Sequence, residues 1–125
     1  TGATLAGADL TNATVVSATL TGADLTGATL AGTNLASSNL SSTDLADANL
    51  TNATATSTNL TGADLTDANL TGADLTNATI SSATLLRTNL TNADLSSVTG
   101  TSAILTSVAA TGSSLAFANL NGSTL

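Results

Sequence analysis

The sequence from Thr61 to Leu75 reads TGADLTDANLTGADL. Leucine returns at every fifth residue of this stretch, and alanine stands two positions before each leucine. The same spacing continues outward in both directions, from Leu5 to Leu125, and 20 of these 25 positions are leucine. The other five are Val15, Ala55, Ile80, Gly100 and Ala110. The chain is therefore an internal repeat of five residues from end to end.

A period of five residues fits neither of the two regular elements. Along an α-helix, steps of five turn successive leucines by about 140°, so no apolar stripe forms. Along a flat strand, an odd step alternates between the two faces. The chain must therefore turn once in each repeat. We expect a short strand with alanine and leucine facing inward, followed by a corner of residues that tolerate left-handed dihedral angles.

The corner residues follow a second, longer period. At intervals of twenty residues, one corner holds only asparagine or glycine and another holds mainly serine. These two corner series are Asn12, Gly32, Asn52, Gly72, Asn92, Gly112 and Ser17, Ser37, Ser57, Asn77, Ser97, Phe117. Because each corner keeps its own chemistry, we predict four repeats, or twenty residues, in each coil. No linker or shift in composition interrupts the pattern, so residues 1–125 are expected to form a single domain.

The units Ala63–Asp67 (ADLTD) and Ala68–Gly72 (ANLTG) resemble those of the pentapeptide-repeat family, which follow A-[DN]-L-x-x. The resemblance extends over the whole chain. It implies an all-β fold, a right-handed quadrilateral parallel β-helix, with about six coils for this length. The departures from the pattern are Val98, Gly100, Ile104, Val108 and Ala110. We expect a distorted coil around these residues, near the C-terminus.

Charge and composition argue against several classes of function. The net charge is −7, with eight acidic residues, all aspartate, and one arginine. A chain with a single cation cannot grip phosphates, so we expect no direct binding of nucleic acid. No apolar run is long enough for a transmembrane segment. Without cysteine there is no disulfide or thiolate metal site.

Some outward aspartates should form a ladder if a coil has twenty residues. Asp24, Asp44 and Asp64 would lie in line on one face, about 4.8 Å apart. The plain interpretation is a solvated acidic surface that favours solubility. The sharper one is a weak Ca²⁺ site, because stacked carboxylates repel and a hard cation would relieve them. No other metal and no cofactor is predicted.

A corner beside this ladder carries Asp47, Asp67 and then Arg87, and we expect Asp67 and Arg87 to be neighbours. Paired carboxylates can suggest hydrolysis. Here they lie on a convex rod, and the chain has no His, Cys, Lys or Tyr to assist them. We therefore predict no catalytic residue and no enzyme activity.

Two outward faces are poor in charge. One carries Asn49, Asn69 and Asn89 beside Thr51, Thr71 and Thr91. The other carries only threonine and asparagine at its central positions, which are Thr19, Asn39, Asn59, Thr79, Thr99 and Asn119. Asparagine ladders can hydrogen-bond along a stack, which would be a structural role. The functional interpretation is a flat contact surface for another rod, or an ice-binding face that orders water. Phe117 is expected outside and, together with Leu86 and Ile104, would mark a contact patch.

These features predict a non-enzymatic structural or scaffold protein whose rods associate through coil ends or flat faces. No cap is visible at either end, and uncapped β-edges pair with other chains. The family resemblance implies an alternative, an acidic rod that mimics DNA and binds a type II topoisomerase. Such proteins typically dimerise through a C-terminal helix, which is not visible here. A third alternative is an ice-binding protein. The Thr-, Ser- and Asn-rich surface and the lack of lysine favour an extracellular or cell-surface location.

Overall fold

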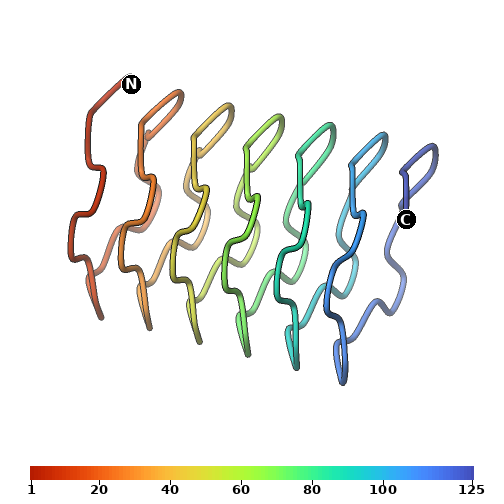
Figure 1. Cartoon of the computed structure of the whole chain (residues 1–125). Coiled ribbons are helices and arrows are strands. Elements are labelled where there is room, and N and C mark those ends of the chain that lie inside the picture. The colour runs from red at the N-terminus through yellow and green to blue at the C-terminus, as the bar shows by residue number, and fades with distance from the viewer.

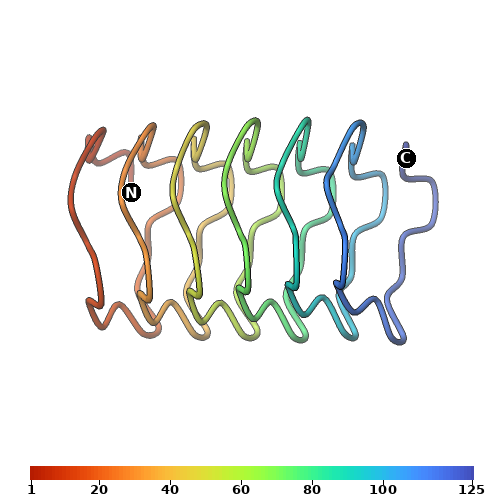
Figure 2. The ribbon, with the colours of Figure 1, turned by 60° about the horizontal axis from the view of Figure 1, so that its bottom comes forward.

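The computed structural model describes all residues from Thr1 to Leu125. The chain winds into coils that stack side by side along one axis, with the two termini at opposite ends of the stack (Figures 1 and 2). Parallel bridges join each residue at the middle of a face to the residue twenty positions later, from Thr4–Asp24 to Ile104–Thr124. This register confirms the prediction of four repeats in each coil.

The predicted strand in each repeat is right only in part. Every repeat contains one bridged residue, flanked by one residue on either side and followed by a two-residue turn. The bridges stay isolated, so the chain has no continuous strand, and it has no α-helix. The reason is the short distance between corners, because the chain turns away before a second residue can join the ladder. No helix in the chain is long and apolar enough to span a bilayer.

The corners confirm the expectation of left-handed dihedral angles. In every repeat the corner residue has a φ between +55° and +72°. Glycine, asparagine, aspartate and serine fill nearly all of these positions, and these residues are common in turns. Arg87 and Phe117 are the two bulky exceptions, with φ of +56° and +60°.

Backbone hydrogen bonds hold neighbouring coils together. The N–H groups of the central leucine and of the corner residue donate to the following coil, as from Leu45 to the carbonyl of Asp64 (2.7 Å). The N–H of the bridged residue donates to the preceding coil, as from Asp64 to the carbonyl of Thr43 (2.9 Å). With three such bonds in each of four repeats, twelve join two neighbouring coils. A further bond closes most corners, as from the N–H of Ala48 to the carbonyl of Leu45 (3.0 Å).

The interior of the stack is a continuous column of leucine and alanine, as the repeat predicts. The central residues from Leu25 to Leu105 are buried, and all of them except Gly100 belong to one apolar cluster. Some of the smaller inward positions carry a hydroxyl instead of alanine, and these are Thr33, Ser38, Thr43, Thr58 and Thr88. Each of these hydroxyls donates to a backbone carbonyl, so the core contains no unpaired polar side chain.

The prediction of a distorted coil near the C-terminus is wrong. Bridges continue through Thr79–Thr99 and Thr84–Ile104, and the corners there keep φ near +58° to +62°. Side chains of the adjacent coils fill the space that Gly100 leaves. A Cβ on Gly100 would lie 2.7 Å from Leu120 Cδ2 and 2.9 Å from Ile80 Cγ1. The large residues above and below therefore compensate for the missing side chain.

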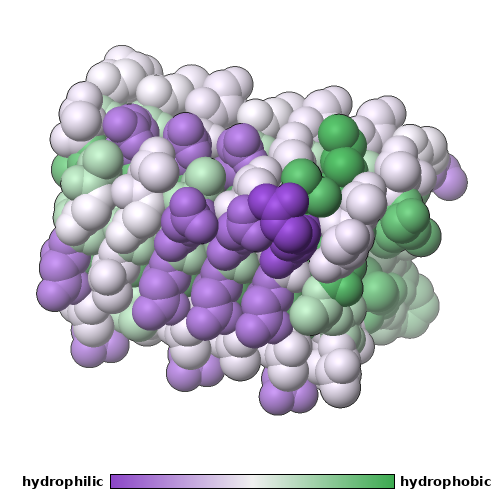
Figure 3. Space-filling view, in the orientation of Figure 1, coloured by the Kyte–Doolittle hydropathy of each residue, from purple (hydrophilic) through white to green (hydrophobic).

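The two end coils are less well covered than the middle of the stack. At the N-terminal end Leu5, Leu10, Val15 and Leu20 are only partly buried. At the other end Leu125 is 81% exposed. Figure 3 shows the resulting hydrophobic atoms towards the C-terminal end of the stack. The core is thus complete on its sides and open along its axis.

Candidate interaction surfaces

The outward aspartates and asparagines have a local structural role in the turn that follows them. The residue after each leucine has a backbone N–H that joins no other backbone group. In the repeats with Asp or Asn at the bridged position, the side-chain Oδ1 accepts this N–H, as in Asp64 with Thr66 (2.9 Å) and Asn69 with Thr71 (3.1 Å). The threonine hydroxyl often donates to the same oxygen. The [DN] of the repeat therefore caps its own turn.

The face with Asn49, Asn69 and Asn89 is organised by these caps. The three residues are in register, joined by parallel bridges. Each Oδ1 accepts the N–H of the threonine two positions later, which is Thr51, Thr71 or Thr91. The expected hydrogen bonds between asparagines along the stack do not form on this face, where each Oδ1 is bonded only within its own turn. The amide nitrogens point to no partner in the chain and are available as donors.

The second uncharged face, which we call the neutral face, runs along the whole stack. Its bridged residues are Thr19, Asn39, Asn59, Thr79, Thr99 and Asn119, and beside them lie Thr21, Ser41, Thr61, Ser81, Thr101 and Asn121. Three contacts run between coils here. Asn59 Nδ2 donates to Asn39 Oδ1 (3.3 Å), the hydroxyl of Ser41 donates to that of Thr21 (3.4 Å), and the hydroxyls of Ser81 and Thr101 bond to each other (3.0 Å). This face alone shows the stacked asparagine bond that the sequence predicts.

The acidic ladder of Asp24, Asp44 and Asp64 lies in register on another face. The hydroxyl and then the backbone N–H of Thr26 donate to Asp24, and these bonds lower the pKa of Asp24 below its ordinary value of 3.8. No three acidic side chains of the chain come together as a metal-binding group. The Ca²⁺ site stays a prediction, and a calcium-dependent rise in Tm that Asp44→Asn abolishes would support it.

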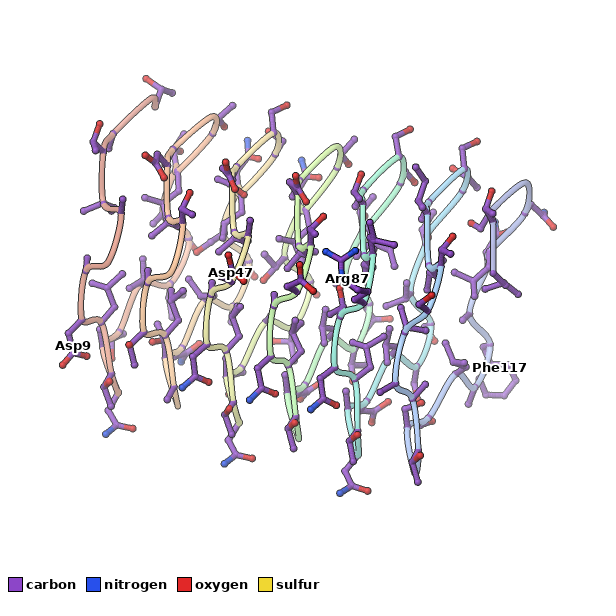
Figure 4. All side chains as sticks on the ribbon, viewed as in Figure 1. Asp9, Asp47, Arg87 and Phe117 are labelled. Carbon is purple, nitrogen blue, oxygen red and sulfur yellow. The ribbon has the colours of Figure 1, made fainter.

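The corner beside the acidic ladder carries Asp47, Asp67 and Arg87 at intervals of twenty residues. Figure 4 shows Asp47 and Arg87 in one row along the stack. The expected contact between Asp67 and Arg87 is confirmed. Arg87 Nε donates to Asp67 Oδ1 (2.7 Å), and Nη2 donates to Oδ2, so the pair is bidentate. The hydrogen bond from Arg87 lowers the pKa of Asp67. Figure 3 shows hydrophilic side chains gathered across the middle coils.

The predicted patch of Phe117, Leu86 and Ile104 does not form. Leu86 and Ile104 lie close to the corner of Arg87, on the face of the acidic ladder. Phe117 belongs to the corner series that starts at Ser17, two corners away and therefore on the opposite side of the coil. Phe117 is 92% exposed, as expected. The three residues are outward and near one another in the sequence, but they lie on different sides of the coil.

Two features escaped the sequence analysis. Val16 is 45% exposed and directly precedes Ser17, the first residue of the corner series that ends at Phe117. A β-branched residue at a turn position is the sequence signal that indicates this exposed side chain. On the asparagine and glycine corner, each asparagine side chain lies over the glycine of the next coil. A Cβ on Gly72 would overlap Oδ1 of Asn52, and the same holds for Gly32 with Asn12. The strict alternation of asparagine and glycine at this corner is the sequence signal for this packing.

The rod has no pocket.

Comparisons with known proteins agree with this architecture. HetL, a pentapeptide repeat protein involved in heterocyst differentiation regulation in the cyanobacterium Nostoc sp. strain PCC 7120, is 31% identical, with a TM-score of 0.42, 100% of this chain covered and 69% of that one. Rfr23, a pentapeptide repeat protein of the cyanobacterium Cyanothece 51142, is 27% identical, with a TM-score of 0.50 and coverage of 89% and 63%. This chain thus spans roughly two thirds of these proteins.

A more distant structure is QnrB1, a plasmid-mediated fluoroquinolone resistance protein, at 18% identity, a TM-score of 0.43 and coverage of 95% and 66%. No curated protein matches the chain. The family model for pentapeptide repeats matches in eight copies, over residues 1–36, 18–54 and 58–96. Because these matches cover well over half of the sequence and follow the coils described above, the chain belongs to the pentapeptide-repeat family.

Proposed function

We propose that the chain is a non-enzymatic structural scaffold, a right-handed quadrilateral β-helix of about six coils whose copies stack end to end. The regular core and the flat outer faces support a role as a rigid rod. The observation that carries the proposal is the complementarity of the two open ends in hydrogen-bonding groups and in apolar surface.

The two open ends differ in the groups they offer. At the C-terminal end the N–H groups of the leucine and corner positions, such as Leu115 and Phe117, donate to no group within residues 1–125. At the N-terminal end the corresponding acceptors, such as the carbonyls of Thr4 and Asp9, accept nothing. A head-to-tail contact would pair these groups with the geometry used inside the rod. It would also cover the partly exposed leucines at both ends. A head-to-tail contact that does not close into a ring adds one copy after another and forms a filament.

The test uses the 125-residue chain at increasing concentration, in analytical ultracentrifugation and negative-stain electron microscopy. The proposal expects rods that lengthen with concentration. Ala110→Asp places a carboxylate on the open apolar end and should stop growth, whereas Ala109→Asp, one residue away on an outer face, should not. If the particles keep the length of a single chain at every concentration, end-to-end stacking is contradicted.

A second candidate function rests on the acidic ladder. Asp24, Asp44 and Asp64 are in line, and the next corner adds Asp47 and Asp67, so five of the eight aspartates lie on one side of the rod. A row of carboxylates on a rod could occupy a DNA-binding groove, and we propose a type II topoisomerase as the alternative partner. Inhibition of DNA supercoiling by the chain, lost on replacing the ladder with asparagines, would favour this role. No effect at micromolar protein would exclude it.

A further inference from the structure

We infer that two copies of the chain pair side by side and antiparallel through the neutral face, with Phe117 of each copy packed against Val16 of the other. This rests on the proposed self-association but uses a different surface from the coil ends. It names both the occupant of the neutral face and the direction of pairing.

Charge selects the face. Each copy has a net charge of −7, so two copies repel unless they approach through surfaces without carboxylates. The faces of the acidic ladder, of Asp9 and of Asp74 and Asp94 each bring aspartates to a contact. The neutral face and the two corners that border it carry no charged side chain over the full length of the rod. A second copy can therefore lie on this face without bringing aspartate against aspartate.

The neutral face also has free hydrogen-bonding groups. The Oδ1 atoms of Asn39 and Asn119 accept backbone N–H groups of their own turns, while their amide nitrogens donate to nothing in the chain. The hydroxyls of Thr79 and Thr99 make no hydrogen bond either. Hydroxyls both donate and accept, so a face built from hydroxyls and amides can pair with a copy of itself. This favours an isologous contact, in which the same patch serves on both partners.

Two apolar residues then set the direction. Phe117 and Val16 lie along the same edge of the neutral face, at opposite ends of the rod. Phe117 is 92% exposed and holds a φ of +60°, a conformation that is strained for a bulky side chain. The same corner in the preceding coils carries only serine or asparagine. An exposed aromatic at a strained position is typical of a contact residue.

A two-fold axis perpendicular to the rod brings these residues together. It places the Phe117 corner of one copy along the same corner of the other, running in the opposite direction. Phe117 of one copy then lies level with Ser17 of the other, next to its Val16. Ser37 of one copy likewise lies level with Ser97 of the other. A parallel pair would set Phe117 against the opposite edge of the neutral face, where glycine and serine line the corner. Only the antiparallel pair gives both apolar residues an apolar partner.

Cysteine cross-linking tests the pairing, because the chain has no natural cysteine. Ser37→Cys and Ser97→Cys chains are prepared separately, mixed and oxidised mildly. The expected result is a mixed disulfide dimer, with little cross-linking of either variant alone. The control mixture of Ser37→Cys with Ser57→Cys, whose residues would not be level, should not cross-link. Cross-linking of Ser37→Cys with itself, or no dimer in any mixture, would overturn the antiparallel pair.

A second measurement separates this inference from end-to-end stacking. Phe117→Ser should raise the dissociation constant of the lateral dimer at least tenfold in sedimentation velocity, and Leu86→Ser, on the acidic side, should leave it unchanged. Ala110→Asp should stop rod growth but keep the cross-linked dimer. A lateral dimer that is insensitive to Phe117→Ser would contradict the inference, even if rods still form end to end.

Discussion

Replacing Gly72 with alanine should destabilise the rod more than the same change at Gly62, although both glycines have nearly the same φ, +68° and +67°. A left-handed conformation costs an alanine roughly 1–2 kcal/mol, and reduced freedom of the unfolded chain returns about 0.4–1 kcal/mol. Gly62→Ala should therefore cost about 0.5–1 kcal/mol. Its Cβ would meet only the Ser42 hydroxyl at 3.7 Å, which is an ordinary contact.

At Gly72 the new Cβ would overlap Oδ1 of Asn52, so the asparagine must leave its position over the corner. Asn52 is exposed and its Oδ1 is the end of a flexible side chain, so turning that side chain aside should add about 0.5–1.5 kcal/mol. Urea unfolding of Gly62→Ala, Gly72→Ala, Asn52→Gly and the double variant Asn52→Gly/Gly72→Ala measures the difference. In the Asn52→Gly background, Gly72→Ala should cost no more than Gly62→Ala. A coupling energy below about 0.5 kcal/mol would refute the interlocked corner.

Three other predictions follow from the core, the turn caps and the ion pair. Leu65→Ala should lower the free energy of unfolding by about 2–5 kcal/mol in urea, because Leu65 is fully buried. Leu115→Ala, at a partly open end coil, should lower it clearly less. Equal losses of stability would contradict the core described here. Asn69→Ala leaves a turn N–H without its cap and should cost about 0.5–1.5 kcal/mol, whereas an unchanged unfolding midpoint would deny the cap its role. The lowered pKa of Asp67 means that its pairing with Arg87 stabilises the folded state above the ordinary carboxyl value of 3.8 and is lost as the pH falls through the lowered pKa. The difference in Tm between the natural chain and Arg87→Gln should therefore be constant near neutral pH and shrink below about pH 4. A difference that grows in acid would contradict the stabilisation by this ion pair.

The sequence alone predicted the features that depend on spacing. Leucines five residues apart, with small residues two positions before them, can all be buried only if the chain turns in every repeat. Gly, Asn, Asp and Ser at the corners indicated left-handed dihedral angles, and the structure has them at each corner. The contact of Asp67 with Arg87 followed from the twenty-residue interval.

Features that depend on side-chain packing between coils were harder to predict. The departure at Gly100 suggested distortion, yet the compensation comes from Ile80 and Leu120, each twenty residues away. The asparagine side chains at the bridged positions bind within their own turns, and only Asn39 also accepts a bond from the next coil, a difference that the spacing does not reveal. Phe117, Leu86 and Ile104 are outward apolar residues in the same third of the sequence, but their places within the coil put Phe117 on the opposite side.

Contacts between residues twenty positions apart are the most direct test of the coil. A NOESY spectrum of the ¹⁵N- and ¹³C-labelled chain measures them through cross-peaks between the backbones of bridged residues, such as Asn49 with Asn69 and Asp44 with Asp64. The twenty-residue register predicts these cross-peaks throughout the stack, together with leucine methyl contacts at the same interval. Backbone contacts at fifteen or twenty-five residues instead, or the short-range pattern of an α-helix, would contradict it.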